Sequence, residues 1–283
     1  MFSKKLIFLL SAAVSLPSFA GYAEAQKKFG VSNASLTGHR DLIIEISEDG
    51  YYFSLVPWVK EYLAKYNKVD SDLDRSIDQV MNAVGVKTFE SLPESMLKKV
   101  NSPNVRYILA KRYLSSSNYS AVEGMLSKVE AKHPAYPFIT HLLGVNYSHK
   151  GDYKGAVAAF NDCVNASEKR ISKIDDDSYR NQMGQNKDYC LAGIARAYYG
   201  MGEYKQAELS YIDIPKESII WPTILFEEAW NSFQLKNYNR TLGKLVTYKA
   251  PVMDFVFNPE VEVLKAISYL KMCLYDDARS IAD

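Results

Sequence analysis

The C-terminal two thirds of the chain repeat one arrangement of small, aromatic and polar residues around regularly placed tyrosines. These are Tyr119, Tyr153, Tyr204, Tyr238 and Tyr275. They are separated by 34, 51, 34 and 37 residues, so that the second distance is 34 plus 17 and the last is 34 plus 3. A period of about 34 residues is the length of a unit made of two helices and a turn. The pattern therefore predicts a row of helical hairpins.

Four further positions keep a constant distance from each tyrosine. Nine residues before it lies a small residue: Ala110, Gly144, Ala195, Ala229 and Ala266. Six before it lie Tyr113, Tyr147, Tyr198, Ser232 and Tyr269. Three after it come Val122, Ala156, Ala207, Thr241 and Ala278, and seven after it Leu126, Phe160, Tyr211, Leu245 and Ala282. Small residues let two helices approach closely, and the large side chains beside them fill the remaining volume.

The predicted turns and unit ends carry residues suited to breaking a helix. Asn118, Gly151 and Gly202 precede the tyrosines, and Asn and Gly accept the left-handed backbone conformation that ends a helix. Pro134 closes the first unit, where the next helix has to begin afresh.

This pattern resembles the tetratricopeptide repeat (TPR) family, and its best match is Leu143, Gly144, Tyr147, Gly151, Tyr153, Ala156 and Phe160. The resemblance covers residues 103–283 in about five units that start near residues 103, 137, 188, 222 and 259, the last one incomplete. Ser232 and Thr241 depart from the family pattern in the fourth unit. The resemblance implies an all-α fold, a right-handed α-solenoid of TPR-like helical hairpins.

Residues 21–102 do not follow the repeat and are predicted to form an N-terminal helical capping region. One amphipathic helix is expected around Trp58, and another at residues 71–84, with Ser71 as its N-cap and Gly85 as its stop. The short apolar runs in residues 42–56, divided by Asp49-Gly50, fit a short hairpin and fit helices equally. We expect the region to cover the exposed end of the first repeat.

A polar stretch, residues 164–187, separates the second unit from the third and contains Asp175, Asp176 and Asp177. We expect the preceding helix to run past its usual end and a loop to follow. The glycine and terminal glutamate of an EF-hand are missing, so the acidic run is predicted to cap a helix rather than bind Ca²⁺. The stretch could instead contact a partner.

The first twenty residues have the features of a secretory signal peptide. Lys4 and Lys5 precede a short apolar run, and Ser18 and Ala20 place small residues where a signal peptidase cuts. The run is too short to span a bilayer of about 30 Å as a helix. We therefore predict cleavage near Ala20, export to the periplasm or the extracellular space, and a soluble mature chain without a membrane span.

Composition and charge narrow the possible functions. The formal net charge is +1 over the whole chain, which gives no electrostatic attraction to nucleic acid. Cys163, Cys190 and Cys273 form an odd set with no metal or redox spacing, and a Cys163–Cys190 bond is possible but not decided by spacing. His141 and His149 are eight residues apart, two helical turns rather than the one turn usual for a metal pair.

No phosphate-binding, dinucleotide, hydrolase or zinc motif occurs in the sequence, so we predict no catalytic residues, no metal and no cofactor. The resemblance implies that the first helix of each unit lines a concave groove. The residues predicted to bind a partner there are Tyr107, Lys111, Phe138, His141, Tyr189, Arg196, Tyr199, Phe226 and Trp230. Aromatic residues with an arginine are typical of protein-binding hot spots. The Lys and Asn clamp for a terminal carboxylate, known in the family, is replaced by Tyr107 and His141.

The leading functional hypothesis is thus an exported scaffold that binds a protein or peptide segment, within a cell-envelope assembly. A second hypothesis is the helical part of a larger envelope enzyme whose catalytic domain lies beyond residue 283, because the fifth unit stops short of its full length. A third is a structural oligomer that pairs through its last helices.

Overall fold

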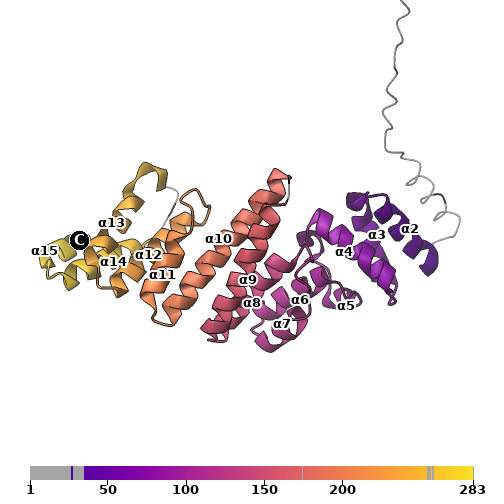
Figure 1. Cartoon of the computed structure of the whole chain (residues 1–283), viewed down its shortest axis with the longest axis horizontal. Helices are drawn as coiled ribbons and strands as arrows, with labels where there is room; N and C mark the ends of the chain where they lie inside the picture. The colour runs from indigo at the N-terminus through magenta and orange to yellow at the C-terminus, as the bar shows by residue number, and fades with distance from the viewer. Residues whose placement is uncertain (1–26, 28–34, 174, 254–255, 257, 283) are drawn as a thin grey trace, which may run out of the picture. The chain divides into compact units, whose positions relative to one another are not determined.

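The computed structural model describes residues 27, 35–173, 175–253, 256 and 258–282. The predicted signal peptide, residues 1–20, lies outside them. Every regular element of the described part is a helix, which confirms the all-α prediction (Figure 1). The chain divides into two compact units, residues 1–105 and 106–283.

The N-terminal unit is built on three helices that pack against one another: α2 (Leu36–Glu48), α3 (Tyr52–Lys65) and α4 (Ser71–Val84). A 3₁₀ turn (Val86–Phe89) and the short α5 (Glu94–Leu97) follow them. The core between the helices is apolar and fully buried, and it includes Ile43, Ile46, Leu55, Val59, Leu63, Leu73, Ile77 and Val80. The expected covering of the first repeat by this region stays a prediction.

The structure decides between two alternatives that the sequence left open for this unit, and it corrects one predicted helix cap. Residues 42–56 form the end of α2 and the start of α3 rather than a hairpin, and Gly50, with φ of 80°, makes the link between the helices. Leu42, Ile43 and Ile46 are all buried, as helical spacing requires, whereas strand alternation would have exposed one of them. Asp70, not Ser71, is the N-cap of α4, and its carboxylate accepts hydrogen bonds from the N–H groups of residues 72 and 73.

The C-terminal unit is a row of helical hairpins, an α-solenoid of TPR-like repeats, in which each helix packs against its neighbours in the chain (Figure 1). Its helices are α6 (Pro103–Ser115, whose first residues belong to the N-terminal unit), α7 (Tyr119–Leu126), α8 (Tyr136–His149), α9 (Tyr153–Ile171), α10 (Asp177–Gly200), α11 (Tyr204–Ile212), α12 (Trp221–Gln234), α13 (Tyr238–Val246), α14 (Glu260–Lys271) and α15 (Tyr275–Ala282). Two 3₁₀ turns, Thr247–Lys249 and Pro251–Met253, follow α13.

The turn inside each hairpin has the same backbone geometry in all the repeats. The residue two positions before each repeat tyrosine has a positive φ: Ser117, Gly151, Gly202, Lys236 and Cys273, with φ between 59° and 77°. Only two of these are glycine, so three hairpins hold a side chain in the left-handed region. In the first four hairpins the next residue is the N-cap of the second helix, so Asn118 caps α7 and is not its left-handed residue.

Most of the stretch between the second and third repeats is helical, which corrects the expected loop at residues 164–187. The helix α9 does run on, to Ile171, but α10 begins at Asp177 instead of near residue 188. Asp176 caps α10 by accepting a hydrogen bond from the N–H of Tyr179. Packing explains the extension, because the Asn186 amide donates to Ser167 Oγ at 3.1 Å in a fully buried contact between α9 and α10.

A disulfide also joins α9 and α10, one helical turn from the contact between Asn186 and Ser167. Cys163 on α9 and Cys190 on α10 are bonded, with their Cα atoms 6.2 Å apart, which answers the question that the spacing left open. Both cysteines are fully buried, whereas Cys273 is an exposed free thiol.

Candidate functional site

The residues predicted to line a groove all keep part of their side chain accessible to solvent. They come from the first helices of the repeats: α6 carries Tyr107 and Lys111, α8 carries Phe138 and His141, α10 carries Tyr189, Arg196 and Tyr199, and α12 carries Phe226 and Trp230. The structure brings six of them together around two neighbouring hollows: His141, Tyr189, Arg196, Tyr199, Phe226 and Trp230. Tyr107, Lys111 and Phe138 line neither hollow.

The first hollow lies between α8 and α10 and has a volume of about 240 Å³. The His141 ring lines it, with its centroid 5.8 Å from that of the Phe160 ring and 6.3 Å from that of the Tyr189 ring. Burial and, to a lesser degree, the positive charge of Arg196 lower the pKa of His141 to about 4. At neutral pH this hollow therefore presents an uncharged imidazole among aromatic rings.

Two glycines make the floor of this hollow possible. A Cβ atom at Gly144 on α8 would lie 2.6 Å from the Phe160 ring, and one at Gly193 on α10 would lie 2.5 Å from the same ring. Ordinary carbon–carbon contacts are about 3.5–4.0 Å, so either methyl group would collide with the ring. Phe160, from α9, is thus held against the backbones of both first helices.

The second hollow lies between α10, α12 and the start of α14 and has a volume of about 490 Å³. Its wall is aromatic, with Tyr199, Phe226 and Trp230, and its charged groups are Arg196, Glu227 and Glu260. The Phe226 and Trp230 rings meet edge to face with centroids 6.5 Å apart. Both rings also pack against the core formed by α12, α13 and α14, which fixes their positions.

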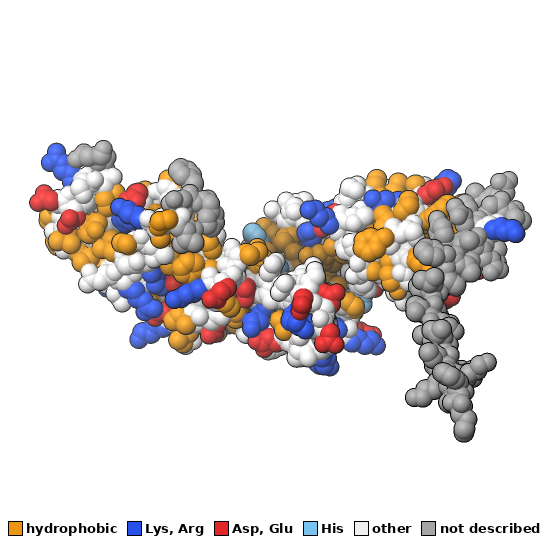
Figure 2. Space-filling model, turned by 90° about the horizontal axis from the view of Figure 1, so that it is seen from above, with side chains coloured by type: hydrophobic (Ala, Val, Ile, Leu, Met, Phe, Trp, Pro, Cys, Tyr) orange, Lys and Arg blue, Asp and Glu red, His pale blue; other side chains and the backbone are white. Residues whose placement is uncertain are grey.

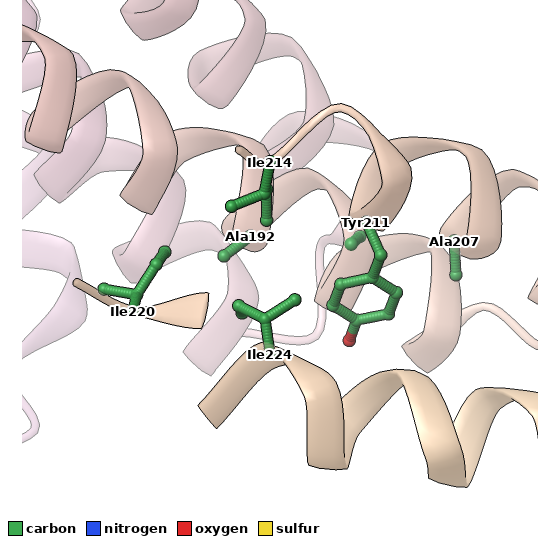
Figure 3. Packing of buried hydrophobic residues seen from close by; sticks show 7 residues of the cluster. Ala192, Ala207, Tyr211, Ile214, Ile220 and Ile224 are labelled. Carbon is green, nitrogen blue, oxygen red and sulfur yellow. The ribbon is translucent and has the colours of Figure 1, made fainter. Parts of the chain in front are cut away.

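The two hollows share Arg196, whose guanidinium is held by a carboxylate of the next repeat. Its Nε donates to Glu227 Oε2 at 2.8 Å and its Nη2 donates to Glu227 Oε1 at 2.6 Å. The Tyr211 hydroxyl donates to the same Oε2 at 3.1 Å. Figure 3 shows the Tyr211 ring among the apolar residues of α10–α12, with its hydroxyl directed towards α12.

The electrostatic environment keeps Arg196 and Tyr211 protonated, so both remain hydrogen-bond donors to Glu227. Burial raises the pKa of Tyr211, and the Glu227 carboxylate raises it further, so the hydroxyl stays protonated and remains a donor. For Arg196, burial alone would lower the pKa, but the hydrogen bond and charge of Glu227, together with Tyr211 and Tyr189, raise it by more, so the net pKa is raised. The pair is therefore charged on both sides and close to neutral as a whole.

Sequence reasoning missed the acidic side of this site. Glu227 pairs with Arg196, and Glu260 adds a second carboxylate, but neither residue was among those predicted to line the groove. A signal was present, since Glu227 directly follows Phe226, a predicted groove residue in the next repeat. Tyr211 was identified only as a packing residue, and nothing in its position indicated that its hydroxyl would reach α12.

The surface charges form no patch of one sign on the face drawn in Figure 2. There, Lys and Arg side chains are interspersed with Asp and Glu. The described residues contain no group of three or more His, Cys, Asp and Glu placed to hold a metal ion. In the same part of the chain, no helix has the length and apolar character needed to cross a membrane. That the protein binds no nucleic acid stays a prediction.

Among known proteins, a similarity is found only at the level of three-dimensional structure. No family model matches the chain, and no curated protein matches it. Among solved structures it is similar to a chain described as a kinesin light chain with nearly identical TPR-like repeats, from Podosopora anserina. The two share 15% sequence identity with a TM-score of 0.49, over 64% of this chain and 93% of that chain.

Proposed function

We propose that this protein is a non-catalytic, exported scaffold that binds a segment of another protein across α8, α10 and α12. The observation that carries this proposal is the pair of adjoining hollows lined by His141, Tyr189, Tyr199, Phe226 and Trp230. Large apolar side chains in an open depression provide contact area for a partner. The Phe226 and Trp230 rings are already packed against the core formed by α12, α13 and α14, so these two side chains lose little conformational entropy on binding.

The arrangement suits an elongated segment rather than a small molecule. The hollows lie on consecutive first helices and are joined at Arg196, so a peptide could occupy both at once. The Arg196–Glu227 pair between them supplies hydrogen-bonding groups at a fixed place. Such groups select the register of a peptide, while the aromatic walls supply most of the binding free energy.

Two independent features support export. The first is the predicted signal peptide with cleavage near Ala20. The second is the Cys163–Cys190 disulfide, because such bonds persist mainly in oxidising compartments. Mass spectrometry of the mature protein tests the first and is expected to find Gly21 at the N-terminus. Thiol labelling of the unreduced, denatured protein tests the second and should modify Cys273 alone.

Photo-crosslinking in the native host tests binding in the groove. A photoreactive amino acid is placed at position 199 or 230 in separate variants, and at position 209 as the control. Leu209 is 59% exposed on α11 and lines neither hollow, so it reports contacts made by chance. We expect a discrete adduct from positions 199 and 230 and none from position 209. Folded variants that form no adduct at either groove position would refute the proposal.

A further inference from the structure

We propose that the second hollow binds a basic side chain, lysine or arginine, of the partner segment. This inference rests on the proposed function and names the chemistry that the hollow recognises. Its walls combine four aromatic residues, Tyr199, Tyr211, Phe226 and Trp230, with an excess of negative charge. Neither feature alone would identify a ligand, but together they favour a cation over an anion or an apolar group.

The charge follows from the groups around the hollow. Arg196 and Glu227 cancel one another as a bidentate pair, and Tyr211 is a neutral donor to Glu227. Glu260, exposed in the first turn of α14, is the remaining charged group of the lining. Among the described residues, no cation lies within ion-pair distance of Glu260. The lining therefore carries one net negative charge, available to a guest.

The aromatic wall adds an attraction that only a cation can use. The face of an aromatic ring is electronegative, and a cation within about 6 Å of the ring centroid is drawn to it, most strongly by tryptophan. Trp230 is half-buried and held between Phe226 and Phe233, whose ring centroids lie 6.5 Å and 5.7 Å from its own. A lysine or arginine stem also buries apolar surface against these rings while its charged end reaches Glu260.

The opposite choice, an acidic guest bound by Arg196, is disfavoured by the same contacts. Arg196 already directs Nε and Nη2 at Glu227, so an entering carboxylate would compete with a bond of 2.6 Å. It would also meet the charges of Glu227 and Glu260 across the hollow. The first hollow lacks such selectivity, because His141 is neutral there.

Peptide selection on the folded chain tests the inference. A phage library of random dodecapeptides is selected on the immobilised wild-type chain and depleted on Trp230→Ala. We expect lysine or arginine to dominate one position of the retained peptides. A labelled peptide of that sequence is then compared by fluorescence anisotropy with its norleucine version, which keeps the stem but loses the charge. The norleucine peptide should bind about 5–30-fold more weakly, the range expected for one desolvated cation–aromatic contact.

Two protein variants distinguish the effect of the Glu260 charge in the hollow from the effect of the net charge of the protein. Glu260→Gln should weaken binding of the basic peptide by about 2–5-fold, the effect of one exposed charge pair. Glu217→Gln makes the same change of charge at an exposed position outside the hollow and should leave the affinity within about twofold. Circular dichroism confirms that both variants fold.

The remaining outcomes overturn one proposal or both. Peptides that require Trp230 but carry acidic or purely apolar residues at the selected position would overturn the basic-guest inference and leave the scaffold function standing. Equal binding of the lysine and norleucine peptides would do the same. If no peptide distinguishes the wild-type chain from Trp230→Ala, the groove does not bind peptide segments, and the scaffold proposal fails together with this one.

Discussion

The contact between Phe160 and Gly193 yields a sharp prediction about stability. In the interior of an exposed helix, replacing glycine by alanine stabilises a protein by about 1 kcal/mol, because alanine has the higher helix propensity. At position 193 the new methyl group would lie 2.5–2.7 Å from three atoms of the Phe160 ring. That ring is 2% exposed and equally close to Gly144, so it has little room to move.

Overpacking of this kind costs about 1–3 kcal/mol, and contacts this short favour the upper end of the range. After subtracting the gain in propensity, we expect Gly193→Ala to lower the free energy of unfolding by about 2 kcal/mol. Gly184 is the matched control, because it lies on the same helix and a Cβ atom there would meet nothing within 4 Å. Gly184→Ala should therefore stabilise the protein by about 0.5–1 kcal/mol.

Urea unfolding followed by circular dichroism at 222 nm measures both effects as shifts of the transition midpoint. Replacing the ring tests the cause directly. Phe160→Leu is destabilising by itself, but it should remove most of the penalty of Gly193→Ala, with a coupling free energy of about 1–2 kcal/mol. If Gly193→Ala is as stable as Gly184→Ala, or if its effect is unchanged in the Phe160→Leu background, the steric argument is wrong.

Three further predictions concern the disulfide, a histidine and a helix cap. Replacing Cys163 and Cys190 together by serine should cost about 3–4 kcal/mol in urea unfolding, because the bond closes a loop with a sequence separation of 27; equal midpoints for the variant and the oxidised wild type would contradict this. The pKa of His141 is lowered from 6.5 to about 4 in the folded chain. Between these pH values the imidazole is protonated in the unfolded chain but not in the folded chain, so the free energy of unfolding should fall as the pH decreases from 6.5 to 4. His141→Gln should reduce that slope, and an unchanged slope would count against the assignment. Because Asp70 and not Ser71 is the N-cap of α4, Asp70→Ala should destabilise the N-terminal unit by about 1 kcal/mol and Ser71→Ala by much less, as measured by thermal melting. The reverse order of the two effects would show that the cap is misplaced.

The extent to which sequence could predict the site differs from residue to residue. The predicted groove residues on the first helices came from the resemblance to the TPR family, and they do keep part of their surface accessible. The pairing of Arg196 with Glu227 did not follow from the sequence, since their atoms meet only when the helices of two repeats are stacked at a given distance. Gly193 was not singled out either, because its role depends on a ring contributed by α9.

The amino-acid sequence by itself determined the helical hairpins and their order. Small and large residues at fixed distances from each tyrosine impose one way of packing, whatever surrounds them, because they act between neighbouring helices. Glycine at positions 151 and 202 likewise shows where two of the turns lie. These features are local, and local features can be read along the chain.

Only the tertiary structure decided the rest. Residues 42–56 are compatible with two secondary structures as a sequence, and burial against α4 selects the helical one. The stretch before residue 188 becomes helical because Asn186 and Cys190 find buried partners on α9. The net charge of the second hollow is decided in the same way, because the folded chain brings Arg196, Glu227 and Glu260 to the same hollow. Each of these outcomes depends on contacts between segments whose separation in space the chain order does not specify.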